Sequence, residues 1–121
     1  MIRAFAFVAV MIALTNLTVA QSTSATMSET FVVQLDSAGP MVDTYTIDCS
    51  SLAFTSDEAA ERFFKSLQDN LVQFEFDAAS QTATMRLSLP YVADKGWGVA
   101  EWNNYFNSTA ERYGRMFEAF N

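Results

Sequence analysis

Apolar and polar residues alternate along four stretches of the chain, a pattern typical of β-strands that bury one face. In the first stretch Phe31, Val33 and Leu35 share one side, and in the third Phe74 and Phe76 do the same. The four stretches are residues 31–36, 41–48, 72–77 and 82–89. Turn-forming residues separate the members of each successive pair, so the pattern predicts two β-hairpins.

Two other stretches repeat apolar residues at intervals of three and four, the spacing of an amphipathic helix. The first helix is expected over about residues 56–70, where Thr55 and Glu58 have the spacing of a capping box. Its apolar positions are Ala60, Phe63, Phe64, Leu67 and Leu71. The second helix is expected from Val99 nearly to the C-terminus, with Trp102 on its apolar side.

The order of these elements, ββαββα, predicts a two-layer α+β sandwich of the ferredoxin-like type. The helix at 56–70 joins two strands that would lie parallel, and the strand at 82–89 fills the gap between them. The strand at 31–36 would pair with the other edge of 41–48. We therefore expect a four-stranded antiparallel sheet with both helices on one face and a polar open face. The predicted strand order is 31–36, 41–48, 82–89 and 72–77.

The N-terminal pattern is typical of a secretion signal peptide. Arg3 precedes an apolar run at residues 4–14, which is shorter than the roughly 20 residues that a membrane-spanning helix needs. The small residues Thr18 and Ala20 suit a cleavage site. We expect a secreted or periplasmic protein with no membrane insertion after cleavage. The expected segments are a signal peptide at 1–20, a flexible leader at 21–30 and one α+β domain at 31–121.

Acidic side chains outnumber basic ones by 14 to 7, and the chain has no histidine. Without Arg3 the exported chain has 14 acidic and 6 basic side chains, a net charge of −8. Such a surface repels nucleic acid and anionic lipid, so no nucleic-acid partner is expected. The absence of histidine excludes Ser-His-Asp and Cys-His catalysis as well as imidazole metal sites.

Cys49 is the single cysteine, so it is either a buried apolar side chain or the site of an intermolecular disulfide. The strand–helix–strand–strand order of residues 45–89 resembles that of heavy-metal-associated domains. The Cys-x-x-Cys loop that would hold the metal is missing, because Ser50, Ser51 and Leu52 follow Cys49. The sequence therefore predicts neither a metal site nor a cofactor.

Aromatic residues around an expected loop at 91–98 form the candidate binding site. Tyr91, Trp97 and Tyr105 lie in this loop or off the apolar stripe of the second helix. Exposed aromatic side chains often anchor a ligand or a partner. The alternative is that the loop folds back and these rings cap the core.

These patterns favour an exported, non-enzymatic module that binds a protein or a small ligand. One alternative is a structural homodimer, linked through Cys49 or by pairing of the edge strands at 31–36 or 72–77. Another is a hydrolase that uses carboxylates alone, since two acids in a cleft suffice for glycosidic chemistry. The candidate carboxylates are those of Asp36, Asp48, Glu75 and Asp77.

Overall fold

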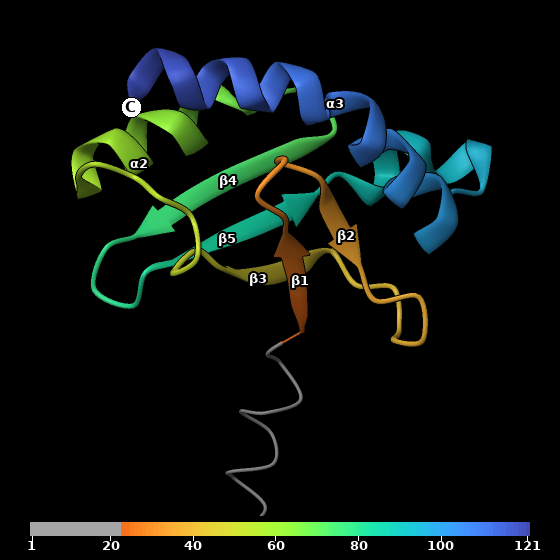
Figure 1. Cartoon of the computed structure of the whole chain (residues 1–121). Helices are drawn as coiled ribbons and strands as arrows, with labels where there is room; N and C mark the ends of the chain where they lie inside the picture. The colour runs from red at the N-terminus through yellow and green to blue at the C-terminus, as the bar shows by residue number, and fades with distance from the viewer. Residues whose placement is uncertain (1–22) are drawn as a thin grey trace, which may run out of the picture.

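The computed structural model describes residues 23–121, which form a mixed β-sheet with two α-helices on one face (Figure 1). The expected signal peptide at 1–20 lies outside the described residues. The strands are β1 (Ser24–Met27), β2 (Val33–Leu35), β3 (Thr44–Asp48), β4 (Val72–Asp77) and β5 (Thr82–Leu87). The helices are α2 (Asp57–Ser66), the 3₁₀ helix η1 (Leu89–Lys95) and α3 (Val99–Phe120). The strand order is β2-β1-β3-β5-β4.

Strand β1 shows that the predicted four-stranded, ferredoxin-like antiparallel sheet is wrong. It lies between β2 and β3, which the prediction had paired directly, and it runs parallel to β3. It also falls within residues 21–30, where a flexible leader was expected. Ala25 and Met27 are buried in the core, so β1 contributes to folding like any other strand. With only four residues it shows too little alternation to be recognised from sequence.

The other half of the sheet follows the predicted order. Strand β5 lies between β3 and β4 and pairs antiparallel with both. Alternate residues of these strands, such as Tyr45, Ile47 and Met85, are buried beneath the helices. Their neighbours form a polar face, which carries Thr44, Thr46, Asp48, Gln73, Glu75, Asp77, Thr82, Thr84 and Arg86.

Helix α2 is shorter than the predicted span of 56–70. Its N-cap is Ser56 instead of Thr55, and the Ser56 hydroxyl accepts a hydrogen bond from the Ala59 amide at 3.0 Å. The predicted loop at 91–98 is largely occupied by η1, which ends at Gly96 in a left-handed conformation. Helix α3 begins at Val99, as expected from its apolar repeat.

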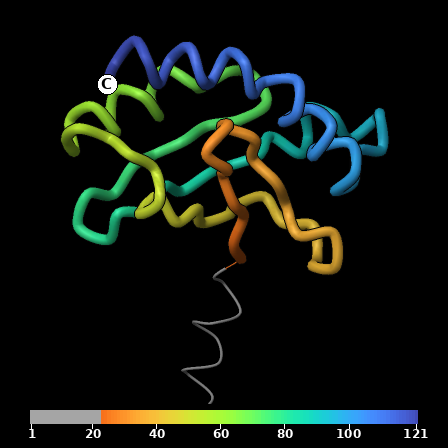
Figure 2. Tube along the Cα trace, viewed as in Figure 1, coloured from red at the N-terminus to blue at the C-terminus, as the bar shows by residue number. Residues whose placement is uncertain are grey.

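The core lies between the sheet and the two helices and is rich in aromatic rings. Its largest fully buried side chains are Trp102, Tyr45, Tyr113, Phe63, Phe64 and Phe106. The end of α3 lies beside the segment that leads into α2, as the chain trace shows (Figure 2). There the Asn121 side chain donates to the Ala53 carbonyl at 3.0 Å and accepts from the Thr55 amide at 2.7 Å. These bonds attach the end of α3 to the segment that leads into α2.

Candidate functional site

The turn between β1 and β2 holds an aromatic residue in the left-handed backbone region. Phe31 has a φ of 66°, which costs a residue other than glycine about 1–2 kcal/mol. The Phe31 amide donates to the Ser28 carbonyl at 2.9 Å, and the Ser28 amide donates to the Val32 carbonyl at 3.0 Å. These bonds define a three-residue hairpin loop whose last position is left-handed and usually glycine. Backbone strain of this kind motivates a search for a role of the Phe31 side chain.

Packing under α3 offsets the strain at Phe31. The centroid of its ring lies 4.8 Å from that of Phe117 and 5.8 Å from that of Phe63. Aromatic pairs of this kind contribute about 0.5–1.5 kcal/mol each beyond simple burial. An added Cβ at Gly114 would touch the Phe31 ring at 3.5 Å, so this glycine leaves the space beside the ring open.

That space is an open groove of about 530 Å³ between three segments of the chain. Its walls come from the C-terminal half of α3, the turn between β1 and β2, and residues 51–53 ahead of α2. The apolar part of the lining consists of Phe31, Leu52, Ala53, Gly114 and Phe117. A groove with an apolar floor and a few polar groups at its edge is the usual form of a ligand site.

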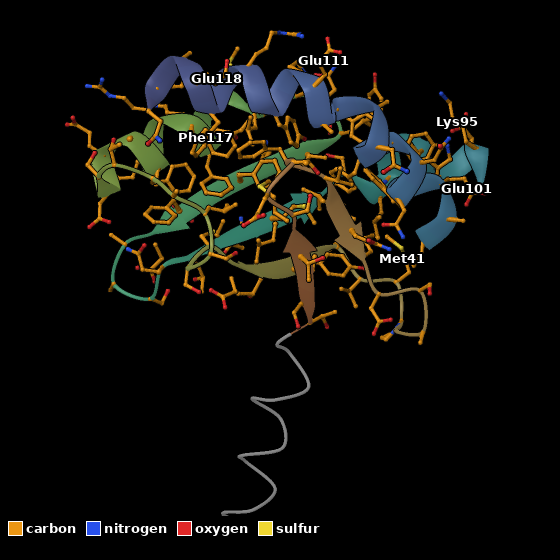
Figure 3. The ribbon with its side chains drawn as sticks, viewed as in Figure 1. Met41, Lys95, Glu101, Glu111, Phe117 and Glu118 are labelled. Carbon is orange, nitrogen blue, oxygen red and sulfur yellow. The ribbon has the colours of Figure 1, made fainter. Side chains whose placement is uncertain are left out.

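Carboxylates dominate the rim of this groove. Glu29, Glu111 and Glu118 oppose the single cation Arg115, so three negative charges and one positive charge give the lining a net charge of −2. Arg115 Nη1 lies 2.7 Å from Glu111 Oε1. Within residues 23–121, Glu29 and Glu118 have no ion-pair partner. Figure 3 shows Glu111 and Glu118 on the outer side of α3, with Phe117 directed toward the protein interior.

The predicted aromatic site is only partly brought together. Trp97 packs edge-on against the buried Trp102, with ring centroids 5.0 Å apart, and lies 6.1 Å from Tyr105. These two candidates therefore cap the core, as in the alternative reading of the sequence. Tyr91 is 59% exposed on η1 and forms no aromatic pair with described residues. The three candidate residues do not form a single exposed binding surface.

Tyr105 has a structural partner that the sequence did not indicate. Its hydroxyl donates to Asp69 Oδ2, and Arg112 Nη2 lies 3.3 Å from the same oxygen. Asp69 Oδ1 accepts from the Leu71 amide at 2.8 Å and the Val72 amide at 2.9 Å. Burial, followed by the bond to Asp69, raises the pKa of Tyr105. This network joins α3 to the turn before β4, which accounts for Tyr105 without a ligand.

Cys49 lies in the core at the end of β3, where it is 1% exposed. Its thiol donates to the Ile47 carbonyl at 3.5 Å. Burial, with a smaller effect of the nearby Asp48 carboxylate, raises the pKa of Cys49 to about 12. A disulfide to a second chain would require this end of the sheet to open, because the sulfur is inaccessible in the folded domain.

Three of the four candidate carboxylates hold turns. Asp36 accepts from the Ala38 amide at 2.9 Å, Asp48 from the Ser50 amide at 2.9 Å, and Asp77 from the Ala79 amide at 3.0 Å. Each of these bonds spans two residues, which is the geometry by which aspartate stabilises a turn.

The remaining candidate carboxylate, Glu75, lines a second groove at the edge of β4. Residues 23–121 contain no group of three or more carboxylate, thiol or imidazole side chains that could hold a metal ion. None of the helices in that range is long and apolar enough to span a bilayer.

Comparison with protein-family models gave no match, and searches of curated proteins and of solved structures gave no significant match.

Proposed function

We propose that this protein is an exported, non-enzymatic binding module whose ligand has an apolar body and a cationic group. The observation that carries the proposal is the groove under α3, with Phe31 and Phe117 in its floor and carboxylates along its rim. Export rests on the N-terminal sequence pattern alone.

The chemistry of the groove selects the class of ligand. Apolar surface placed over the Phe31 and Phe117 rings gains about 25 cal/mol per Å² removed from water. A cation near Glu29 and Glu118 gains from two carboxylates that have no ion pair within residues 23–121. The same carboxylates repel an anionic amphiphile, so charge at the rim provides specificity.

Octylamine and nonanoate are matched probes of this proposal, because both carry an eight-carbon alkyl chain and they differ in the charge of the head group. Titration of ¹⁵N-labelled protein at low salt should show tighter binding of octylamine, with amide shifts at Ala53 and Gly114 beside the groove. Affinity should rise by up to about fourfold for each added CH₂ in a series of alkylamines, since each buried CH₂ contributes about 0.8 kcal/mol.

The double variant Glu29→Gln/Glu118→Gln should weaken octylamine binding by about twofold to thirtyfold, because two exposed ion pairs at about 0.2–1 kcal/mol each contribute about 0.4–2 kcal/mol. The double variant Glu61→Gln/Glu75→Gln changes the net charge equally at the other groove and should bind octylamine like the original protein. Equal affinity for nonanoate and octylamine, or shifts away from Ala53 and Gly114, would refute the proposal.

A further inference from the structure

Strand β4 forms an edge of the sheet beside α2, with a sheet neighbour on one side only (Figure 1). The Ser88 amide donates to the Leu71 carbonyl at 2.9 Å, so residue 71 directs its carbonyl toward β5, while its amide donates to Asp69 Oδ1. Antiparallel ladders alternate, and Phe74 and Phe76 therefore direct their N–H and C=O groups outward. An edge with outward-facing backbone groups is a template for another strand.

The accessible part of this edge is short and has a defined start. The Val72 amide donates to Asp69 Oδ1 at 2.9 Å, and the Val72 carbonyl accepts from the Asp69 amide at 3.0 Å. The outward groups of Val72 are thus already used by the turn. An incoming strand would pair with Phe74 and Phe76, across about four residues.

A groove of about 480 Å³ lies along this same edge. Glu61 and Lys65 of α2 and Gln68, which follows the helix, line one side of it, and residues 73–76 of β4 form its base. Thr84 and Arg86 of β5 extend the lining onto the open face of the sheet. The free backbone edge and the groove together provide main-chain bonds and side-chain contacts, the two elements by which extended peptides add to sheets.

Charge argues against a second copy of this chain as the occupant. Antiparallel self-pairing that uses both Phe74 and Phe76 places Glu75 directly opposite Glu75 of the second copy. A register centred on Phe76 places Glu75 opposite Asp77. A register centred on Phe74 needs the polar groups of Val72, which already bond to Asp69. Like charges directly opposite each other destabilise a strand pair.

We propose that the edge of β4 binds a short extended segment of a partner protein with alternating basic and apolar side chains. The basic side chains lie beside Glu75 and Asp77, the acidic residues that β4 itself carries on the open face. The two cations of the groove lie farther from the edge, Lys65 on α2 and Arg86 on β5. The apolar side chains lie on the other face, beside the half-buried Phe76 ring and α2. The backbone of the segment pairs with Phe74 and Phe76. This surface is distinct from the groove under α3, so either proposal can fail without the other.

The probe is the capped peptide Lys-Val-Lys-Val-Lys, with Glu-Val-Glu-Val-Glu as its matched control. In ¹⁵N titrations of the whole domain, the lysine peptide should bind at least fivefold more tightly. The largest shifts should fall at the amides of Phe74 and Phe76. The variant Glu29→Gln/Glu118→Gln should bind the lysine peptide unchanged, which separates this surface from the amine groove.

Two substitutions test the mode of binding. Phe76→Pro removes an outward N–H without removing a ladder bond to β5, and it should bind the lysine peptide about fivefold to tenfold more weakly than Phe76→Ala does. Gln73→Lys/Glu75→Lys should reverse the preference in favour of the glutamate peptide, because both positions are exposed on the open face of β4. This readout keeps the turn bond of Asp77 and holds even where Phe76→Pro fails to fold. The proposal would be overturned by equal binding of the two peptides or by a preference that the lysine variant does not reverse. Dimerisation in sedimentation, with NMR shifts at Phe74 and Phe76, would also overturn it.

Discussion

The strain at Phe31 leads to a prediction in which glycine stabilises the fold more than alanine does. Both Phe31→Ala and Phe31→Gly remove the ring and its pairs with Phe117 and Phe63. Alanine keeps the left-handed cost of about 1–2 kcal/mol, whereas glycine adopts a φ of 66° freely. The glycine variant has more conformational freedom in the unfolded chain, which lowers its free energy of unfolding by about 0.4–1 kcal/mol. The difference leaves Phe31→Gly more stable than Phe31→Ala by about 1 kcal/mol.

The ring itself should contribute more than the strain costs. Two aromatic pairs at about 0.5–1.5 kcal/mol each, together with partial burial, make the original protein about 2–3 kcal/mol more stable than Phe31→Ala. Phe31→Gly should therefore lie between the two. In a domain of this size, a difference of 1 kcal/mol corresponds to about 5 °C in Tm.

Urea unfolding followed by tryptophan fluorescence measures these differences, with Thr30 as the matched control position. Thr30 lies in the same turn and does not have a positive φ. Thr30→Ala should be at least as stable as Thr30→Gly, because no left-handed cost applies there. If alanine were as stable as glycine at position 31, the argument that backbone strain is stored in this hairpin would be refuted.

Three further predictions concern groups buried in the core or in its polar network. Asp69→Ala should lower the free energy of unfolding by about 3–5 kcal/mol, because two backbone amides, a hydroxyl and a guanidinium all lose the same acceptor. Tyr105→Phe removes one of these bonds and should lower it by about 1 kcal/mol. Equal losses for the two variants in urea unfolding would contradict this prediction. The Cys49 thiol should resist Ellman's reagent at pH 8 in the native protein and react at once in 6 M urea; equal rates would show that it is accessible. Burial raises the pKa values of Cys49 and Tyr113 to about 12, above the values that these groups have in the unfolded chain. The stability that the two neutral side chains contribute is therefore complete below about pH 9 and is lost as the pH rises toward 12. Urea unfolding at pH 8 to 11 should show this decline, and Cys49→Ala should make it shallower.

The candidate groove could not be identified from sequence because its residues come from three separate segments. Glu29 lies in a stretch expected to be a flexible leader, and Phe31 was assigned to the start of a strand. The usual signal for its hairpin, a glycine at the left-handed position, is replaced by Phe31. Only the folded chain brings this turn against Gly114 and Phe117.

For the predicted aromatic site, unlike the groove, the sequence did indicate part of the structure. Sequence spacing correctly distinguished the buried Trp102 from its neighbours, since the apolar repeat defines one face of α3. It could not show that Trp97 would pack on Trp102 or that Tyr105 would bond to Asp69. Trp97 precedes α3 and lies outside its apolar repeat, and Asp69 lies in a distant turn, so both contacts depend on how the turns direct the chain.

The sequence by itself determined the elements whose patterns are long: α3, the core of α2, and the strands β3, β4 and β5 with their buried faces. Apolar residues that recur at every second position, or at every third and fourth, over many residues fit either a strand or a helix, but not both. The wrong secondary structure would expose these apolar side chains to water. The tertiary structure decided the place of β1. Four residues are too few to show a clear alternation, and the neighbours of a strand in a sheet depend on which other strands have unpaired backbone groups. It also decided the two grooves and the open edge of β4, because surfaces of this kind exist only where separate segments meet.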